Sequence, residues 1–454
     1  MLKKNEEYIV DIIDNGIEGE GIAKIDNFTI FIPNVLKGEK VKIKILKVNS
    51  TYCFAKVLEI LSVSKNRAHE DCENYSKCGG CNFRHIEYKH SLELKKNNVE
   101  NTIKKSLGYE IKINEVLGMD NPIYYRNKLQ YPISVDKEGK IVMGVFAERT
   151  HRIIPVENCL LQNESCQKVA NDIFRFLRKY NISGYNEENQ TGIFRHLVIR
   201  IGIKTDEIMV TLVVNDLKIP YEKELVKYIL DNNPNVKTIV KNLNNKNTNV
   251  ILGNRNIILF GDGYIRDILI NKEFKISPMS FYQVNPIQTE KLYSKAIEYA
   301  ELTGKEIVFD LYCGIGTIGI CASDKVNKLY GIETIPEAIE DAKQNAKINN
   351  IENADFFVGD VENELPKFIE ERKILADVVF VDPPRKGCDR AAIETLLNIK
   401  PQKIVYVSCN PATLARDLKL FEEEYKIKKI AICDMFPGTA HCEVVTVMSL
   451  KGNS

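Results

Sequence analysis

The feature that most constrains the fold is the pattern of the last third of the chain, where short apolar segments alternate with helical ones. From about residue 289 onwards the apolar segments are EIVFDLYC, KLYGIE, ADFFVGD, DVVFVDPP, KIVYVSC and EVVTVMSL. Strands that alternate with helices form a mostly parallel sheet covered by helices on both faces. We therefore predict an α/β domain of the Rossmann-like type over residues 271–454.

The chain before this domain is long enough to form further domains. With 454 residues, the protein exceeds the size that one hydrophobic core usually covers, so two or three domains are expected. Residues 1–61 contain short alternating strands with glycine-rich turns, which predicts a small β-barrel. In VKIKILKV one face is apolar and the other carries lysines, namely Val41, Ile43 and Ile45 against Lys40, Lys42 and Lys44. Barrels of this size often bind single-stranded nucleic acid, although a solvated outer face explains the lysines equally well.

The segment between barrel and α/β domain is mixed in character. Residues 62–270 begin with a cysteine-rich stretch, continue with a charged helix near 89–108, and contain several strand pairs. HLVIRIGIKT and EIMVTLVVN are typical of a hairpin. An α+β middle domain is expected, and the charged helix belongs either to it or to the surface of the α/β domain.

Composition limits the compartment and the partners. The chain has 63 basic and 62 acidic residues, a formal net charge of +1, so any nucleic-acid contact must use local patches. It shows no segment of secretory character and no run of about 18 apolar residues, which predicts a cytoplasmic protein that binds no membrane. In that compartment the twelve cysteines are expected to be thiols, available for metals or catalysis. We expect a monomer.

A nucleotide-binding turn is predicted early in the α/β domain. In IVFDLYCGIGTIGI, an apolar strand is followed by Gly314, Gly316 and Gly319, a spacing that lets backbone approach a nucleotide closely. Glu333 ends the next strand, where a carboxylate can accept hydrogen bonds from ribose hydroxyls. These residues fit a dinucleotide or S-adenosylmethionine.

Two later aspartates favour S-adenosylmethionine. Asp360 follows the third strand and can accept a hydrogen bond from an adenine amino group. Asp382 lies in VDPPRKG, where methyltransferases of this architecture place the group that faces the substrate base. Capping of a helix is the alternative role for both carboxylates. A hydride-transfer enzyme has no evident use for Asp382.

Cys409 and Glu443 fit the chemistry of methylation at C5 of a uracil. A thiolate that adds to C6 turns the base into an enolate whose C5 attacks a methyl group, and a base then removes the C5 proton. Cys409 ends an apolar strand before a helix, whose dipole is expected to favour the thiolate, and Glu443 begins the last strand. The competing thiols are Cys313, Cys388, Cys433 and Cys442, of which the last two are better explained as buried side chains.

A cysteine cluster opens the middle domain. Cys72, Cys78 and Cys81 lie close together with two glycines between the last pair, and Cys159 follows at a distance. Four thiolates suit a zinc ion or an iron-sulfur cluster, and the spacing does not decide between them. Cys166 is a rival to Cys159 as the fourth ligand.

Taken together, these motifs resemble the RNA uracil-C5 methyltransferase family, in the branch that modifies 23S ribosomal RNA. GEGIAKIDNFTIFIPNVLKGEKVKIKI resembles the TRAM domain, an OB-like RNA-binding barrel, and C-x5-C-G-G-C with Cys159 resembles the family's 4Fe-4S site. LYCGIGT, DPPRKG, SCNP and HCE occur in the family's order. The resemblance covers nearly the whole chain.

The resemblance implies roles for particular residues. Cys409 corresponds to the nucleophile and Glu443 to the proton acceptor, and the cofactor contacts extend to Gln283 and Tyr312. The cysteine cluster is implied to hold iron and sulfur with a structural role. For the RNA, a stacking aromatic and three phosphate contacts are expected, namely Phe281, Arg126, Lys128 and Arg195. Structural salt bridges explain such arginines equally well.

Other functions fit the sequence less well. Ribosomal RNA is the expected substrate because transfer-RNA relatives are expected to lack the long amino-terminal portion, and transfer RNA is the alternative. Cytosine-C5 enzymes of RNA place a catalytic cysteine where this chain has Asp382-Pro383-Pro384-Arg385. An adenine-N6 enzyme needs no cysteine at position 409. An iron-sulfur RNA-binding protein without catalysis is disfavoured because Cys409 and Glu443 are both present.

Overall fold

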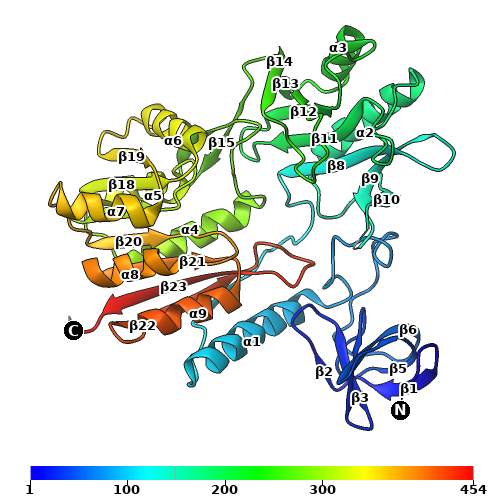
Figure 1. Cartoon of the computed structure of the whole chain (residues 1–454), viewed down its shortest axis with the longest axis horizontal. Coiled ribbons are helices and arrows are strands. Elements are labelled where there is room, and N and C mark those ends of the chain that lie inside the picture. Colours follow the sequence, from blue (N-terminus) through cyan, green and yellow to red (C-terminus); the bar gives the residue numbers. More distant parts are fainter. Residues whose placement is uncertain (1, 149, 453–454) are drawn as a thin grey trace.

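The computed structural model describes residues 2–148 and 150–452, and Figure 1 shows them as three lobes. The blue amino-terminal barrel and the green-cyan middle sheet lie on one side of the view, and the yellow-to-red carboxyl-terminal sheet lies on the other. These lobes contain sheets of six, seven and eight strands, with a separate two-stranded hairpin. No helix of the described residues is long and apolar enough to span a bilayer.

The barrel confirms the predicted alternation of apolar and lysine side chains. Val41, Ile43 and Ile45 are fully buried, whereas Lys40, Lys42 and Lys44 face outwards. The strand order is β1-β5-β6-β4-β3-β2. The strands are β1 (Glu7–Asp11), β2 (Asp14–Asn15), β3 (Gly21–Ile25), β4 (Phe28–Ile32), β5 (Lys40–Val48) and β6 (Tyr52–Ser62).

The middle sheet has the order β10-β9-β8-β11-β12-β13-β14. Its β11 and β12 form the predicted antiparallel hairpin, and β13 then runs parallel to β12. Two helices, α2 (Glu164–Lys179) and α3 (Glu222–Asn232), cover one face. The strands are β8 (Lys128–Val135), β9 (Ile141–Phe146), β10 (Ile153–Pro155), β11 (Phe194–Ile201), β12 (Ile208–Val214), β13 (Val236–Leu243) and β14 (Arg255–Phe260).

The carboxyl-terminal sheet has the order β19-β18-β17-β20-β21-β23-β22-β7. Strands β17 to β21 are parallel, and β23 runs antiparallel to both β21 and β22. This is the Rossmann-like α/β fold predicted from the alternation of strands and helices. The strands are β17 (Ile307–Leu311), β18 (Lys328–Glu333), β19 (Ala354–Val358), β20 (Val378–Val381), β21 (Lys403–Ser408), β22 (Tyr425–Cys433), β23 (Glu443–Leu450) and β7 (Glu115–Leu117).

Helices cover both faces of this sheet because neighbouring strand residues point to opposite faces. Val308 and Phe380 pack under one layer, whereas Phe309 and Val381 pack under the other. The first layer consists of α4 (Pro286–Ala300), α5 (Thr317–Ala322), the 3-10 turn η1 (Ser323–Lys325), α6 (Pro336–Ile348) and the hairpin of β15 (Ile265–Leu269) and β16 (Lys272–Ile276). The second layer consists of α7 (Val361–Glu370), α8 (Arg390–Ile399), α9 (Pro411–Phe421) and α1 (Tyr88–Leu107).

Two early elements lie with the late sheet. The charged helix α1 packs along α9, and its Val99, Ile103 and Leu107 share the core of the second layer. Strand β7 pairs in parallel with β22 at the sheet edge. Of the two positions expected for the charged helix, the structure shows the one on the α/β domain, so residues 62–270 contribute to both the middle sheet and the carboxyl-terminal sheet.

Candidate active site and RNA-facing residues

The predicted cofactor residues lie at one edge of the carboxyl-terminal sheet. Tyr312 follows β17, Glu333 ends β18, Asp360 follows β19 and Asp382 follows β20. The parallel strands are in register, so these four positions reach the same edge. In open α/β sheets, ligands bind in the crevice outside the carboxyl ends of the strands.

The glycine turn at this edge has an unusual backbone. Tyr312, Gly314 and Gly316 have φ angles of 61°, 55° and 81°. All three lie in the left-handed region, which residues other than glycine rarely adopt. The amide of Gly314 donates to Glu333 Oε2 at 3.2 Å, and Oε1 of the same carboxylate accepts from the amide of Ile335 at 3.0 Å. A tight backbone turn beside a fixed carboxylate fits the nucleoside half of a cofactor.

Asp360, Asp382 and Gln283 complete this edge. Asp360 precedes α7, but its side chain makes no capping hydrogen bond, so helix capping does not explain it. Burial raises the pKa of Asp382 to about 7. Burial and the charge of Asp382 raise the pKa of the Tyr293 hydroxyl, and a hydrogen bond with Gln283 opposes that rise. Gln283 and Asp382 therefore both lie beside Tyr293.

Cys409 and Glu443 meet at the same edge. In the antiparallel pair of β21 and β23, Ser408 lies opposite Val444, so one further step of the register places Cys409 opposite Glu443. Burial, and after it the charges of Glu443 and Asp382, raise the pKa of the Cys409 thiol to about 11. Glu443 is only 3% exposed, and burial together with Asp382 holds its pKa well above the ordinary range. Three acidic groups thus share one small volume.

The prediction that the helix after Cys409 favours the thiolate is wrong for the protein alone. Helix α9 begins at Pro411 and is capped by Asn410, whose Oδ1 accepts from the amide of Ala412 at 3.0 Å. The pKa of Cys409 nevertheless rises rather than falls. Burial and two neighbouring carboxyl groups outweigh the helix dipole, whose effect is confined to the first turn.

Arg385 is a charged neighbour of Cys409 and Glu443 that the sequence analysis did not assign to the site. Its charge lowers the pKa of both Cys409 and Glu443 and so opposes the effect of burial. Its carbonyl oxygen accepts from Asn410 Nδ2 at 3.2 Å, which ties its loop to the turn after Cys409. The motif DPPRKG was used to assign Asp382 to the site. Arg385 belongs to the same motif, and its charge could have been used in the same way to assign it.

The competing thiols are buried. Their side chains lie within the two core layers around the sheet, whereas Cys409 is partly exposed at the sheet edge. The buried residues are Cys313, Cys388, Cys433 and Cys442. Among the cysteines at this edge, Cys409 is the one that a substrate can reach.

The four cysteines predicted to bind a metal are partly exposed free thiols that lie in one region, namely Cys72, Cys78, Cys81 and Cys159. Burial raises the pKa of Cys81 to about 12, and the nearby Cys159 and Cys78 contribute. Cys166, the rival fourth ligand, lies instead in the core of the middle sheet. No group of three or more His, Cys, Asp or Glu within residues 2–148 and 150–452 is arranged to hold a metal ion. Four neighbouring thiols are nevertheless the donor set that a metal centre uses.

A group of cations lies behind the loop that carries Phe281, whose side chain is 70% exposed. Burial, and after it the charges of Arg200 and Arg126, lower the pKa of Lys128 to about 8. Arg200 Nη2 donates to the carbonyl of Ser280 at 2.7 Å and so supports the Phe281 loop. No ion pair within the described residues neutralises these three cations. Cations grouped in this way attract anions.

The structure corrects the prediction that Arg195 contacts a phosphate. Its side chain is only 6% exposed, and Nη1 donates to the carbonyls of Asn244 and Lys246 at 2.9 and 2.8 Å. The guanidinium also lies 4.3 Å from the centre of the Tyr185 ring. Arg195 supports a turn of the middle domain and is not available to a phosphate.

The barrel carries an aromatic patch that the sequence analysis did not single out. Phe31, Tyr52 and Phe54 have ring centres 5.5 to 5.9 Å apart on the outer face, and Tyr52 and Phe54 are more than one-third exposed. Lys44 and Lys56 pair across the neighbouring strands. Exposed aromatic rings beside lysines form a surface on which bases can stack.

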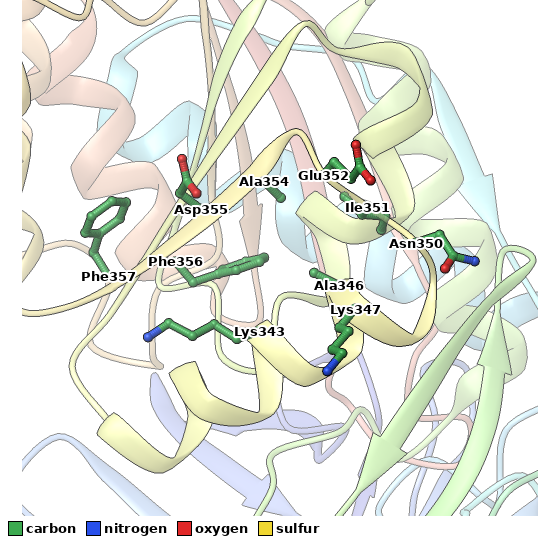
Figure 2. Close-up of a pocket in the computed structure, with 10 residues that line it drawn as sticks. All are labelled: Lys343, Ala346, Lys347, Asn350, Ile351, Glu352, Ala354, Asp355, Phe356 and Phe357. Atoms are coloured by element: carbon green, nitrogen blue, oxygen red, sulfur yellow. The ribbon is translucent and has the colours of Figure 1, made fainter.

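A surface pocket of about 560 Å³ lies away from this edge. It is formed by the last turns of α6 and the start of β19, with Lys343, Lys347 and Phe356 in its wall (Figure 2). Because α6 runs back between two parallel strands, its end lies near the amino end of β19. The pocket is therefore not part of the site that contains Cys409.

Comparisons with known proteins agree with this fold and site. The model of a family described as tRNA (Uracil-5-)-methyltransferase matches residues 87–451, and a TRAM domain model matches residues 2–58. An uncharacterized RNA methyltransferase of Clostridium tetani is 46% identical over 453 residues, which are 100% of this chain and 98% of the relative. A Staphylococcus aureus relative of the same description is 44% identical and covers 99% of both chains. The protein is an RNA methyltransferase.

The particular family follows from the extent of the first match. The chain belongs to the tRNA (uracil-5-)-methyltransferase family, with a TRAM domain at its amino terminus. The crystal structure of Pyrococcus abyssi tRNA (uracil-54, C5)-methyltransferase in complex with S-adenosyl-L-homocysteine is similar to this chain, with a TM-score of 0.78 and 28% identity. That similarity covers 97% of this chain and 99% of that one. The expectation that transfer-RNA relatives lack the amino-terminal portion is therefore wrong.

Proposed function

We propose that this enzyme methylates C5 of a uridine in structured RNA, with S-adenosylmethionine as methyl donor and a covalent bond between Cys409 and C6 of the base. The observation that carries the proposal is the position of Cys409 opposite Glu443, beside Asp382, at the edge of the sheet where ligands bind. Uracil C5 chemistry needs a nucleophile and a base on one target ring. The sheet edge supplies both.

The residues at this edge fit S-adenosylmethionine. Glu333 and Asp360 offer carboxylates for the ribose and the adenine, and the turn at Tyr312 exposes backbone between them. Gln283 and Asp382 lie nearer to the reacting groups, beside Tyr293. When bound, the cofactor supplies an activated methyl group and a positive sulfonium.

The chain's own residues carry the proton and bond changes. Cys409 loses its proton to solvent, and Sγ forms a bond to C6, which places negative charge on the O4–C5 enolate. C5 would then accept the methyl group, and the electron pair of the broken sulfur–methyl bond would remain on sulfur as a neutral thioether. The Glu443 carboxylate removes the C5 proton, the C5–C6 double bond re-forms, and the bond between Sγ and C6 breaks. The raised pKa of Glu443 makes its ionised form a stronger base for that proton.

The RNA-binding surface in this proposal runs from the barrel to the sheet edge. Bases stack on Phe31, Tyr52 and Phe54, and a phosphate neutralises the cations Arg126 and Lys128. The exposed ring of Phe281 contacts a base next to the target. The target uridine leaves its stack to reach Cys409, because C6 is inaccessible within a helix.

We propose 23S ribosomal RNA as the substrate, following the resemblance of the motifs to that branch of the family. Transfer RNA is the second candidate, which the similarity to the Pyrococcus abyssi enzyme favours. In either case we expect the enzyme to act as a cytoplasmic monomer. Nucleoside mass spectrometry of both RNAs, from cells with and without the gene, separates the two. Loss of 5-methyluridine from one RNA identifies the substrate, and no loss from either contradicts the proposal.

We further propose that Cys72, Cys78, Cys81 and Cys159 hold a 4Fe-4S cluster with a structural role. Uracil methylation transfers no electron, so the cluster is expected to order the middle domain. Anaerobically purified protein should be brown, with about four irons per chain if all four thiolates bind one cluster. Colourless protein with stoichiometric zinc would overturn this assignment.

Two substitutions test the covalent mechanism. Glu443→Gln should form the RNA adduct but release it slowly, because the C5 proton is no longer removed. General base catalysis contributes about a hundredfold to ten-thousandfold, so the loss of turnover should fall in that range. Cys409→Ala should form no adduct, whereas Cys53→Ala, a thiol in the barrel core, serves as control. Normal turnover by Glu443→Gln would refute the role of this base.

A further inference from the structure

The loop that leads into Glu443 is anchored outside its own domain. This loop, residues 434–442, joins β22 to β23, and Figure 1 shows it as the red segment that reaches from the sheet towards the blue amino-terminal part of the chain. Glu443 is the first residue of β23. The position of its carboxylate therefore depends on how the loop is held.

Asn82 holds the middle of the loop. The backbone amides of Asn82 and Phe83 both donate to the carbonyl of Gly438, at 3.2 and 3.0 Å. The Asn82 side chain accepts from the amide of Ala440 at 2.8 Å through Oδ1 and donates to the carbonyl of Glu18 at 2.7 Å through Nδ2. One amide side chain thus joins a turn of the barrel to the loop before Glu443.

Lys95 holds the beginning of the loop. Its Nζ donates to Asp434 Oδ1 at 2.5 Å and to the carbonyl of Phe436 at 3.3 Å, and the Lys95 and Asp434 side chains are each 1% exposed. Tyr125 Oη donates to the carbonyl of Pro437 at 3.0 Å. A buried ion pair adds little net stability, but removal of one partner leaves an unpaired buried charge, so such a pair fixes geometry.

The anchor at Asn82 continues directly into the cysteine segment. Asn82 follows Cys81, and a Cβ atom built on Gly438 would lie 3.7 Å from Cys81 Sγ. The cysteine segment and the loop before Glu443 are therefore packed against each other. A displacement of residues 72–81 also moves Asn82. Because Asn82 is hydrogen-bonded to Gly438 and Ala440, the loop moves with it.

We propose that Asn82 and Lys95 are positioning residues for Glu443, and that the cysteine segment influences the rate of C5 proton removal through Asn82. This inference rests on the proposed role of Glu443 as the base. A carboxylate that removes a proton must lie within hydrogen-bond reach of it, and a misplacement of about 1 Å can cost a hundredfold in rate. The loop is bound by Asn82 and Phe83, directly after the cysteine segment, and by Lys95 of α1, so loss of either set of hydrogen bonds lets the loop move.

The variants Asn82→Ala and Asn82→Asp test the anchor. Asn82→Ala removes the acceptor for the Ala440 amide, whereas Asn82→Asp keeps that acceptor and replaces the donor to Glu18 with a carboxylate oxygen. Asn114→Ala is the matched control, because Asn114 Oδ1 accepts from the amide of Ile430 at 2.8 Å on the same strand β22, away from the loop. Lys95→Met is a second test at the other end of the loop.

The readouts are the lifetime of the covalent RNA adduct, RNA affinity, and hydrogen exchange of peptide 434–442 without RNA, at matched iron content. Asn82→Ala should slow adduct release about tenfold to a hundredfold with unchanged RNA affinity, and Asn82→Asp should restore most of the rate. Exchange of the loop should speed up in Asn82→Ala and not in Asn114→Ala. If Asn82→Ala releases the adduct and exchanges the loop amides at the rates of the wild type, the inference is overturned. This conclusion requires that Glu443→Gln accumulates the adduct, which shows that Glu443 is the base. Absence of any adduct in the wild type would refute the proposed function instead.

Discussion

The ionisation of Cys409 gives a quantitative test of the site, because the structure places this thiol in an environment unlike that of a surface cysteine. Burial and the charges of Glu443 and Asp382 raise its pKa to about 11, against about 8.5 for a free thiol. At pH 8 about one Cys409 side chain in a thousand is then a thiolate, against about a quarter of free thiols. The population available to an alkylating reagent is lower by roughly 200-fold.

Part of this difference is offset by intrinsic reactivity. A thiolate of higher pKa is a stronger nucleophile, with a Brønsted slope of about 0.4 to 0.5, so a rise of about 2.5 units gains roughly tenfold. We therefore expect Cys409 in the protein without RNA to react with iodoacetamide roughly 20-fold more slowly than a free thiol at pH 8. The rate should rise about tenfold per pH unit up to pH 10.

Peptide-level mass spectrometry of alkylation between pH 7 and pH 11 measures this profile for Cys409 alone. Arg385→Met removes the cation that opposes the rise in pKa, so alkylation at pH 8 should slow further, by up to about tenfold. Arg390→Met is the control, because Arg390 is exposed on α8 and pairs with Glu394. An apparent pKa of 8.5 or below for Cys409 in the wild type would refute the reasoning from burial and charge.

Three further predictions concern RNA binding. The charged form of Lys128, whose pKa is about 8, is the form that attracts an anion. RNA affinity in anisotropy titrations should therefore fall between pH 7 and pH 9, and Lys128→Met should flatten this dependence. An equal slope in both proteins would contradict the assignment. Tyr52→Ala should weaken binding of single-stranded RNA by about 1–3 kcal/mol if a base stacks there, and unchanged affinity would exclude the patch. Arg195→Met should lower the free energy of unfolding in urea by about 1–3 kcal/mol and leave the salt dependence of RNA binding unchanged; a reduced salt slope would restore it as a phosphate contact.

The parts of the fold that the sequence predicts well are those set by local patterns. Alternation of apolar and lysine residues around Ile43 fixes which face of the barrel strand is buried. Alternation of strands and helices predicts the parallel sheet, and residues at the carboxyl ends of such strands meet at one edge. Glu333, Asp382 and Cys409 could therefore be assigned to a common site before their contacts were known.

The rest depends on long-range packing that no local pattern encodes. Val99, Ile103 and Leu107 mark an apolar stripe on α1 but do not say which surface covers it, and the structure supplies α9. The pKa of Cys409 depends on carboxyl groups at the ends of two other strands. The helix that follows Cys409 therefore predicted a pKa shift in the wrong direction. Arg195 carries the charge that a phosphate contact needs. Its burial depends on the turn whose carbonyls it binds, and no local pattern predicts that contact.

The position of α1 and β7 has a consequence for the order in which the protein can fold during synthesis. Ser106 of α1 donates to the carbonyl of Ala415, 309 residues later, and Asn114 accepts from Ile430, 316 residues later. These early segments leave the ribosome long before α9 and β22 are synthesised. Until then the apolar side chains of α1 have no partner from these elements and are exposed or bound to a chaperone. The catalytic sheet can close only when nearly the whole chain has emerged, and a ribosome that stalls before β22 leaves a chain whose barrel can fold but whose active site cannot form.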